Sequence, residues 1–131
     1  MDLPSVLNVT PIYVAIFGLL FFPFTFYVGL GRLKTNILIG DGGNDEMVRR
    51  IRAQANFIET VPMALFLLIM MEVLGASDTW LHSLGSLLVV GRILHYLAMI
   101  EVGPALGRPI GMFATLGTIL ASSIWMLVDV I

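Results

Sequence analysis

A charged stretch that runs directly into an apolar one carries the side chains with the most chemistry in this sequence. It reads Arg-Arg-Ile-Arg-Ala-Gln-Ala-Asn-Phe-Ile-Glu-Thr-Val-Pro from Arg49 to Pro62. Four of its polar residues are spaced three, four and three apart: Arg49, Arg52, Asn56 and Glu59. On an α-helix this spacing places them within a sector of roughly 80°. Charged groups on one face of a membrane segment are costly, so we expect this face to meet a partner helix or a polar ligand.

These groups indicate what kind of ligand would suit them. Arginine forks suit carboxylates, Glu59 suits an ammonium group, and Asn56 and Gln54 suit peptide amides. Arg108 precedes Pro109, where we expect a helix to begin, so its charge adds to the helix dipole and favours an anion such as a thiolate. A zwitterionic, carboxylated thiol such as glutathione fits this description, although the residues alone do not select it.

A purely structural interpretation stays open beside this one. Basic residues at a membrane boundary anchor a protein without any ligand. Inside the helices, Glu59 is the expected partner of Arg92 in a buried ion pair, which would make the polar face a packing feature. We expect Glu72, near the other membrane boundary, to be solvated.

Composition assigns the chain to the integral membrane proteins. It has 131 residues, of which 58% are hydrophobic and only 12% charged, and its mean hydropathy is +0.96. Soluble domains are about 45–50% apolar and about 25% charged. The absence of cysteine excludes disulfides, thiolate metal sites and cysteine nucleophiles. His82 and His95 are too far apart in sequence to predict a metal pair, and no feature predicts a nucleic-acid partner.

The pattern of apolar segments predicts an all-α membrane protein with four transmembrane helices in a single domain, residues 1–131. The expected helices span about residues 8–32, 45–74, 79–101 and 109–130, since about 20 apolar residues cross a bilayer. Pro23 should kink the first helix, and Asn44 or Asp45 should cap the second.

The basic residues predict the orientation. All seven lie toward the connections that follow the first and third helices. The positive-inside rule then places this side in the cytoplasm and both termini across the membrane. The short termini carry no sorting signal, so we expect a plasma membrane, of the bacterial inner type.

The run from Arg52 to Pro62, Arg-Ala-Gln-Ala-Asn-Phe-Ile-Glu-Thr-Val-Pro, resembles the second-helix signature of the MAPEG family, the membrane-associated proteins in eicosanoid and glutathione metabolism. That signature is Arg-Ala-x-x-Asn-x-x-Glu followed by a nearby proline, and every position matches. Gly91-Arg92-Ile93-Leu94-His95, with Arg108 sixteen residues after Arg92, is similar in layout to microsomal prostaglandin E synthase and microsomal glutathione transferase. The chain resembles a short member of bacterial type.

This resemblance implies a homotrimer that holds glutathione, as cosubstrate, between neighbouring subunits. It also implies a catalytic residue, Arg108, which would stabilise the thiolate. The remaining matches are glutathione-binding positions: Arg32, Arg52, Gln54, Asn56, Glu59, Arg92 and His95. The implied activity is that of a glutathione transferase or peroxidase, active in detoxification on lipophilic electrophiles or hydroperoxides.

The sequence departs from the family at three positions. Met99 and Met112 stand where family members have tyrosines that face glutathione, and Pro109 replaces a serine that often follows the catalytic arginine. Tyr96 lies near one lost tyrosine. Thiolate activation would therefore rest mainly on Arg108.

Two other function classes remain as alternatives. A non-catalytic lipid-binding or scaffold protein of the same fold is favoured by the loss of both tyrosines and disfavoured by the presence of Asn56, Glu59 and Arg108. A small multidrug-type transporter would carry a carboxylate within the first helix, and none is present there.

Overall fold

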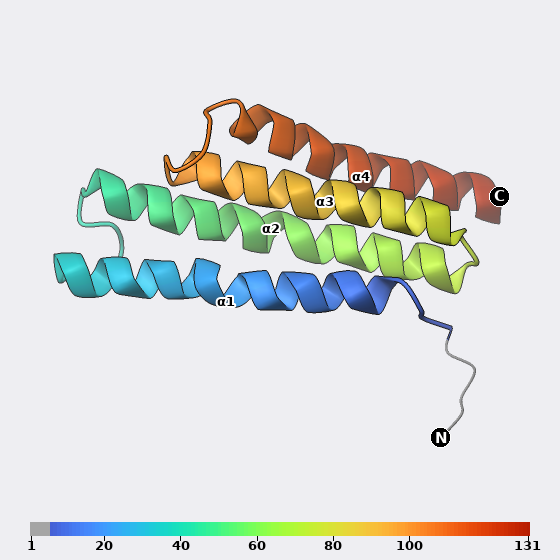
Figure 1. The fold of residues 1–131 in the computed structure, drawn as a ribbon, viewed down its shortest axis with the longest axis horizontal. Coiled ribbons are helices and arrows are strands. Elements are labelled where there is room, and N and C mark those ends of the chain that lie inside the picture. The colour runs from blue at the N-terminus through green and yellow to red at the C-terminus, as the bar shows by residue number, and fades with distance from the viewer. Residues whose placement is uncertain (1–5) are drawn as a thin grey trace, which may run out of the picture.

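The computed structural model describes residues 6–131, and within this range the chain forms four long α-helices (Figure 1). They are α1 (Thr10–Thr35), α2 (Asp45–Val73), α3 (Asp78–Met99) and α4 (Gly107–Val130). By length and composition each of the four could cross a membrane. The expected all-helical, four-span architecture is therefore confirmed, with helix ends within three residues of the predicted ones.

Local capping explains why two of the helices begin where they do. Asn44, one of the two expected caps of α2, accepts a hydrogen bond on Oδ1 from the backbone N–H of Met47, with an N–O distance of 3.0 Å. Ser77 caps α3 in the same way through the N–H of Trp80. Pro23 and Pro62 both lie within continuous helices. Pro23 therefore does not interrupt α1, and the kink expected there stays a prediction.

The four helices lie side by side, and small residues bring α3 and α4 closest together (Figure 1). A Cβ atom added to Gly111 would lie 2.3 Å from the Gly91 carbonyl oxygen, and one added to Gly91 would lie 2.7 Å from the Ala114 Cβ. Helix backbones can approach this closely only where side chains are minimal. Small residues therefore form this contact, and it places the start of α4 against the last turns of α3.

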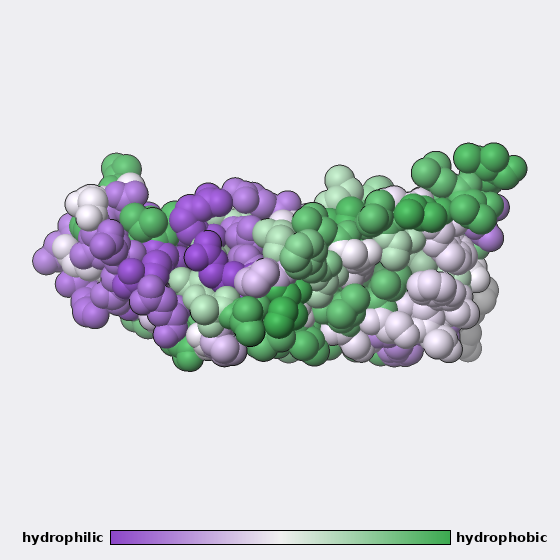
Figure 2. All heavy atoms as spheres, turned by 90° about the horizontal axis from the view of Figure 1, so that it is seen from above, coloured by the Kyte–Doolittle hydropathy of each residue, from purple (hydrophilic) through white to green (hydrophobic). Residues whose placement is uncertain are grey.

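Polar side chains are concentrated at one end of the bundle (Figure 2). This end, which we term the basic end, contains the α1–α2 and α3–α4 connections, and the α2–α3 connection lies at the opposite end (Figure 1). Apolar side chains such as Leu19 and Phe113 are exposed along the helices, as expected of a surface that faces lipid.

Arg50 joins α1 to α2 at the basic end. Its Nη1 donates to the carbonyl oxygen of Tyr27 at 2.7 Å, and its Nη2 lies 2.5 Å from Glu46 Oε1. The guanidinium carbon also lies 3.8 Å from the centroid of the Tyr27 ring, a cation–π geometry. The sequence predicts only membrane anchoring for this arginine, and the structure adds a packing role.

Glu72 joins the same two helices at the opposite end, and here the expectation of a solvated side chain is wrong. The residue is buried, and its carboxylate accepts hydrogen bonds from the backbone N–H groups of Asn8, Val9 and Thr10 at 2.6, 2.6 and 2.8 Å. The Thr10 hydroxyl also donates to it. Since the first N–H groups of a helix have no partner within it, a carboxylate from a neighbouring helix satisfies them.

Candidate functional site

Arg92 lies at the centre of the polar residues that the sequence singles out. It is on α3 about two turns from the helix end at the basic end, and only 1% of its surface is exposed. Nη1 donates to Asn56 Oδ1 at 2.5 Å and to Thr60 Oγ1 at 3.1 Å, both on α2. Nη2 donates to the carbonyl oxygen of Gly111 on α4 at 3.0 Å. One guanidinium therefore connects three helices.

Every acceptor that Arg92 contacts among the described residues is neutral. Its Nε atom is buried and has no hydrogen-bond partner in this part of the chain. A buried charge is normally paired, because desolvation costs several kcal/mol per ion. The site therefore presents a positive charge whose counter-ion is not supplied by the described part of the protomer.

The expected ion pair between Glu59 and Arg92 is wrong. Glu59 Oε1 instead lies 3.8 Å from Arg52 Nη1 on the same helix, and both side chains are more than half exposed. Helix rotation explains the difference. Asn56 and Thr60 face Arg92, and on a helix Glu59 then points roughly 60° away from Asn56 and roughly 100° away from Thr60.

The outward direction of Arg52 and Glu59 gives the site its open side. Both side chains lie on a helix that is long and apolar enough to span a membrane, yet they face away from the protomer. Charged side chains facing lipid are unfavourable, and such residues usually face another protein surface or an aqueous cavity. This face of α2 is therefore suited to another protein surface or to an aqueous cavity rather than to lipid.

His95 and Arg108 are brought to the same end by the contact between α3 and α4. His95 is buried, and a Cβ atom added to Gly111 would lie 2.6 Å from its Cβ. One turn along, an added Cβ at Gly107 would lie 2.5 Å from the carbonyl oxygen of Leu94. The first turn of α4 is thus pressed against α3 beside His95.

Arg108 lies within that first turn and its side chain is exposed. Its backbone N–H bonds to the carbonyl oxygen of Ala105 at 3.2 Å. The helix starts at Gly107, two residues before the predicted position. The side chain of Arg108, rather than its N–H group, is therefore the part that can meet an anion.

Gln54 and Arg32 make contacts on the α1 side of the bundle. Gln54 Nε2 donates to Thr25 Oγ1 of α1 at 3.0 Å. Arg32 Nη1 donates to the carbonyl oxygens of Ile37 and Gly40, at 3.1 and 2.9 Å, and so fixes the α1–α2 loop. Within one protomer these two residues are not brought to Arg92, which is contacted by α2 and α4.

Tyr96 does not occupy the place of a lost tyrosine on the surface of the protomer. Its ring stacks on that of Phe24, with centroids 3.5 Å apart and planes within 4°. The residue is buried, and its hydroxyl has no hydrogen-bond partner among the described residues. Met99 and Met112 are partly buried and offer no hydroxyl.

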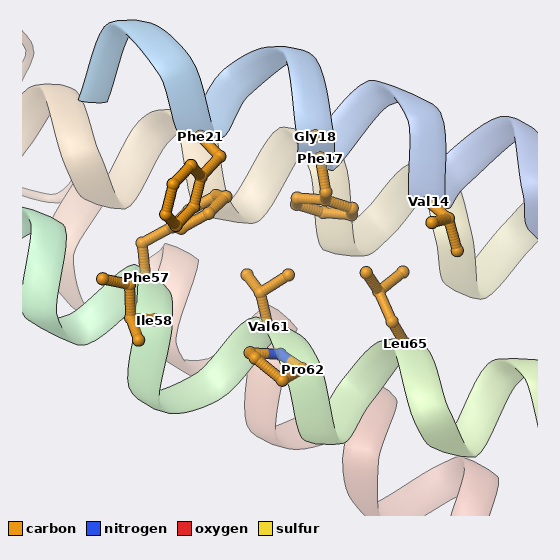
Figure 3. A pocket seen from close by; sticks show the side chains of 9 residues that line it. All are labelled: Val14, Phe17, Gly18, Phe21, Phe57, Ile58, Val61, Pro62 and Leu65. Atoms are coloured by element: carbon orange, nitrogen blue, oxygen red, sulfur yellow. The ribbon is translucent and has the colours of Figure 1, made fainter. Parts of the chain in front are cut away.

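An apolar cavity of about 270 Å³ lies between α1 and α2 (Figure 3). Phe17 and Phe21 of α1 and Phe57 of α2 supply aromatic walls, and the backbone of Gly18 leaves room beside them. The described residues that line it carry no charge. The cavity is suited to an apolar group rather than to a charged one.

Sequence reasoning missed two contacts to Arg92. Thr60 stands one helical turn after Asn56 in the quoted motif, and that spacing was a signal for a second acceptor on the same face. The contact to the Gly111 carbonyl could not be predicted in this way, because every residue has a backbone carbonyl and the residue type does not indicate which one accepts. The ion pair between Arg49 Nε and Glu101 Oε2, 3.6 Å apart, was likewise not foreseen.

Comparison with known proteins shows which proteins this chain is similar to. The chain matches the MAPEG family over residues 10–128, which includes nearly all of the four helices. It is also similar to inner membrane protein YecN of Escherichia coli strain K12, with 35% identity over 88 residues that cover 67% of each chain. YecN of Escherichia coli O6:H1 matches to the same extent. The relative is named for its membrane and not for an activity. From the family match and the four apolar helices, we conclude that this chain belongs to the MAPEG family, which includes glutathione-dependent enzymes.

Proposed function

We propose that the protein is a glutathione-dependent membrane enzyme, a transferase or peroxidase that acts on lipophilic electrophiles or hydroperoxides. The observation that carries this proposal is the buried guanidinium of Arg92, whose acceptors among residues 6–131 are all neutral. A tripeptide that bears two carboxylates and a thiolate supplies the missing negative charge.

The exposed face of α2 supplies the second part of the site. Arg52 suits a carboxylate and Glu59 suits the ammonium group of the same ligand, and both side chains point outward. A site that is open on this face needs a second wall. We therefore propose a homotrimer in which glutathione lies between neighbouring subunits, where Gln54 and Arg32 of the α1 side complete the binding set together with Asn56 and His95.

Arg108 is the proposed catalytic residue. Its guanidinium, at the positive end of α4, stabilises the glutathione thiolate and so raises its concentration at neutral pH. In the transferase reaction the thiolate attacks an electrophilic carbon, and the carbon–sulfur bond forms as the leaving group departs with its bonding electron pair. In the peroxidase reaction it attacks a peroxide oxygen and releases an alcohol, and a second glutathione then reduces the sulfenate, giving the disulfide and water.

The cavity between α1 and α2 is consistent with a lipophilic second substrate (Figure 3). It also supports the second candidate, a non-catalytic lipid-binding or scaffold protein, which the methionines at positions 99 and 112 favour. On either function, the positive-inside rule places the basic end in the cytoplasm and the termini across the membrane.

The experiment that tests the proposal is titration calorimetry of the detergent-purified protein with glutathione, beside Glu59→Ala. We expect binding in the micromolar to millimolar range that is weakened or lost in the variant, because the ammonium partner is gone. Absence of heat in both proteins would overturn the enzyme proposal. Lipids that copurify would then support the second candidate.

Catalysis is tested separately with Arg108→Ala. Loss of one charged group that stabilises a developing anion lowers kcat by about 100-fold. We expect glutathione affinity to change little, because the tripeptide is held by other residues. Equal turnover in the two proteins would remove Arg108 from the mechanism.

A further inference from the structure

Thr60 is not among the residues that the sequence or the family resemblance assigns to the site, yet it contacts the central arginine directly. Its Oγ1 lies 3.1 Å from Arg92 Nη1. The same hydroxyl donates to the backbone carbonyl oxygen of Asn56, one turn back on α2, at 2.8 Å. Thr60 therefore contacts both a side chain of α3 and the backbone of the residue that also binds that side chain.

The single proton of the hydroxyl determines what Thr60 offers to Arg92. A threonine hydroxyl has one proton and two lone pairs. Because the proton is directed to the Asn56 carbonyl, only lone pairs remain for the guanidinium, which can only donate. The hydroxyl is thereby fixed as an acceptor, and Nη1 lies between two oxygens from successive turns of α2.

These contacts fix the direction of the guanidinium plane. Nη1 is held by α2 through Asn56 and Thr60, and Nη2 is held by α4 through the Gly111 carbonyl. An arginine held on neutral oxygens keeps its net charge for a ligand, whereas a carboxylate at the position of Thr60 would cancel it. These contacts therefore orient the Arg92 guanidinium without neutralising its positive charge.

We propose that Thr60 is a positioning residue of the glutathione site, which orients the Arg92 guanidinium toward the anionic groups of the bound tripeptide. The inference rests on the proposed function. It adds a residue that acts through Arg92 and touches neither substrate.

Matched threonines make the test specific. Thr118 on α4 is fully buried and its hydroxyl bonds to the carbonyl oxygen one turn back, that of Ala114, at 2.8 Å, as in Thr60. None of the contacts of Arg92 described above involves Thr118. Valine has nearly the same shape as threonine and lacks the hydroxyl, so Thr60→Val and Thr118→Val remove the same chemistry at two places.

The measurement is the dissociation constant for glutathione by calorimetry, together with kcat and KM where turnover is found, in wild type, Thr60→Val, Thr60→Ser and Thr118→Val. We expect Thr60→Val to weaken binding about tenfold, the effect of one hydrogen bond to a charged group. KM for glutathione should rise while kcat stays within about twofold. Thr60→Ser, which keeps the hydroxyl, should restore binding, and Thr118→Val should bind as the wild type does.

The outcomes separate this inference from the proposed function. If the wild type binds glutathione and Thr60→Val binds equally well, the positioning role is overturned and the enzyme proposal stands. If Thr60→Ser is as weak as Thr60→Val, the lost methyl and not the hydroxyl matters, which also overturns it. A wild type that binds no glutathione overturns the proposed function, and this inference with it.

Discussion

Two buried charged side chains, one toward each end of the bundle, are held in opposite ways. Glu72, at the opposite end, accepts from three backbone N–H groups and a hydroxyl. Arg92, nearer the basic end, donates to two side-chain oxygens and one carbonyl, and its Nε has no partner among the described residues. The hydrogen-bonding capacity of the Glu72 carboxylate is filled by groups of the described chain, whereas that of the Arg92 guanidinium is not.

On the proposed function, the difference separates a charge that stabilises the fold from a charge that can bind a ligand. A group whose hydrogen-bonding capacity is filled by backbone has nothing left for a ligand, and its loss leaves several buried donors unsatisfied. A group held by neutral side chains retains both charge and donors. Burial alone therefore does not distinguish the two groups, whereas the unfilled hydrogen-bonding capacity of Arg92 makes it the candidate for ligand binding.

The largest effect is expected when the saturated charge is removed. Glu72→Ala leaves three N–H groups at the start of α1 without their acceptor and should lower the free energy of unfolding by about 3 kcal/mol. Thermal unfolding in detergent measures this, with Asp78→Ala, an exposed acid at the same end, as the control. Glutathione affinity of the folded protein should not change. A stable Glu72→Ala that had lost binding would reverse the comparison.

Removal of the Arg92 charge should weaken glutathione binding more than it lowers the free energy of unfolding. Arg92→Met is expected to weaken glutathione binding by about 2 kcal/mol, or roughly 30-fold, because a desolvated charged partner is lost. Stability should fall by less than in Glu72→Ala, since an apolar side chain in place of a buried charge is often tolerated. Calorimetry and thermal unfolding on one preparation compare both quantities. Unchanged affinity with a large loss of stability would make Arg92 structural as well.

A change at the helix contact should affect both quantities together. Gly111→Ala places a methyl group 2.3 Å from the Gly91 carbonyl oxygen, so α4 must move and take the acceptor of Arg92 Nη2 with it. We expect a loss of about 1–2 kcal/mol in stability, with weaker binding. Gly117→Ala is the control, because open space surrounds Gly117 on the same helix and alanine favours helix. Equal stability of the two variants would contradict the close contact.

The smallest effect is expected at the half-exposed pair. Arg52→Gln should change the free energy of unfolding by less than about 0.5 kcal/mol, because an exposed pair 3.8 Å apart contributes little. Its effect on glutathione affinity should be larger than its effect on stability. Lys34→Gln, which breaks another exposed pair, with Glu46, should change neither. A strong loss of stability in Arg52→Gln would identify this pair as a structural contact within the protomer.

The four-helix fold could be predicted from the sequence because long apolar runs and capping residues such as Asn44 indicate where the helices lie. The sequence did not predict which polar side chains pair with one another. Glu59 and Asn56 share one face within roughly 80°, but the geometry of a single guanidinium resolves differences smaller than that sector. The prediction that Glu72 is solvated was wrong because its partners are backbone N–H groups far away in the sequence. A backbone partner cannot be recognised from the type of any residue.

The capping of α1 by Glu72 also has a consequence for how the first two helices assemble. Thr10 and Glu72 are separated by 62 positions, so the first helix carries unmatched N–H groups until the end of the second arrives beside it. The contact between Glu72 and the start of α1 is thus made within the pair formed by the first two helices. Backbone N–H groups, and not a lysine or arginine, stabilise this carboxylate. The opposite end therefore needs no basic residue to hold Glu72, which agrees with the charge asymmetry that the positive-inside rule uses to predict orientation.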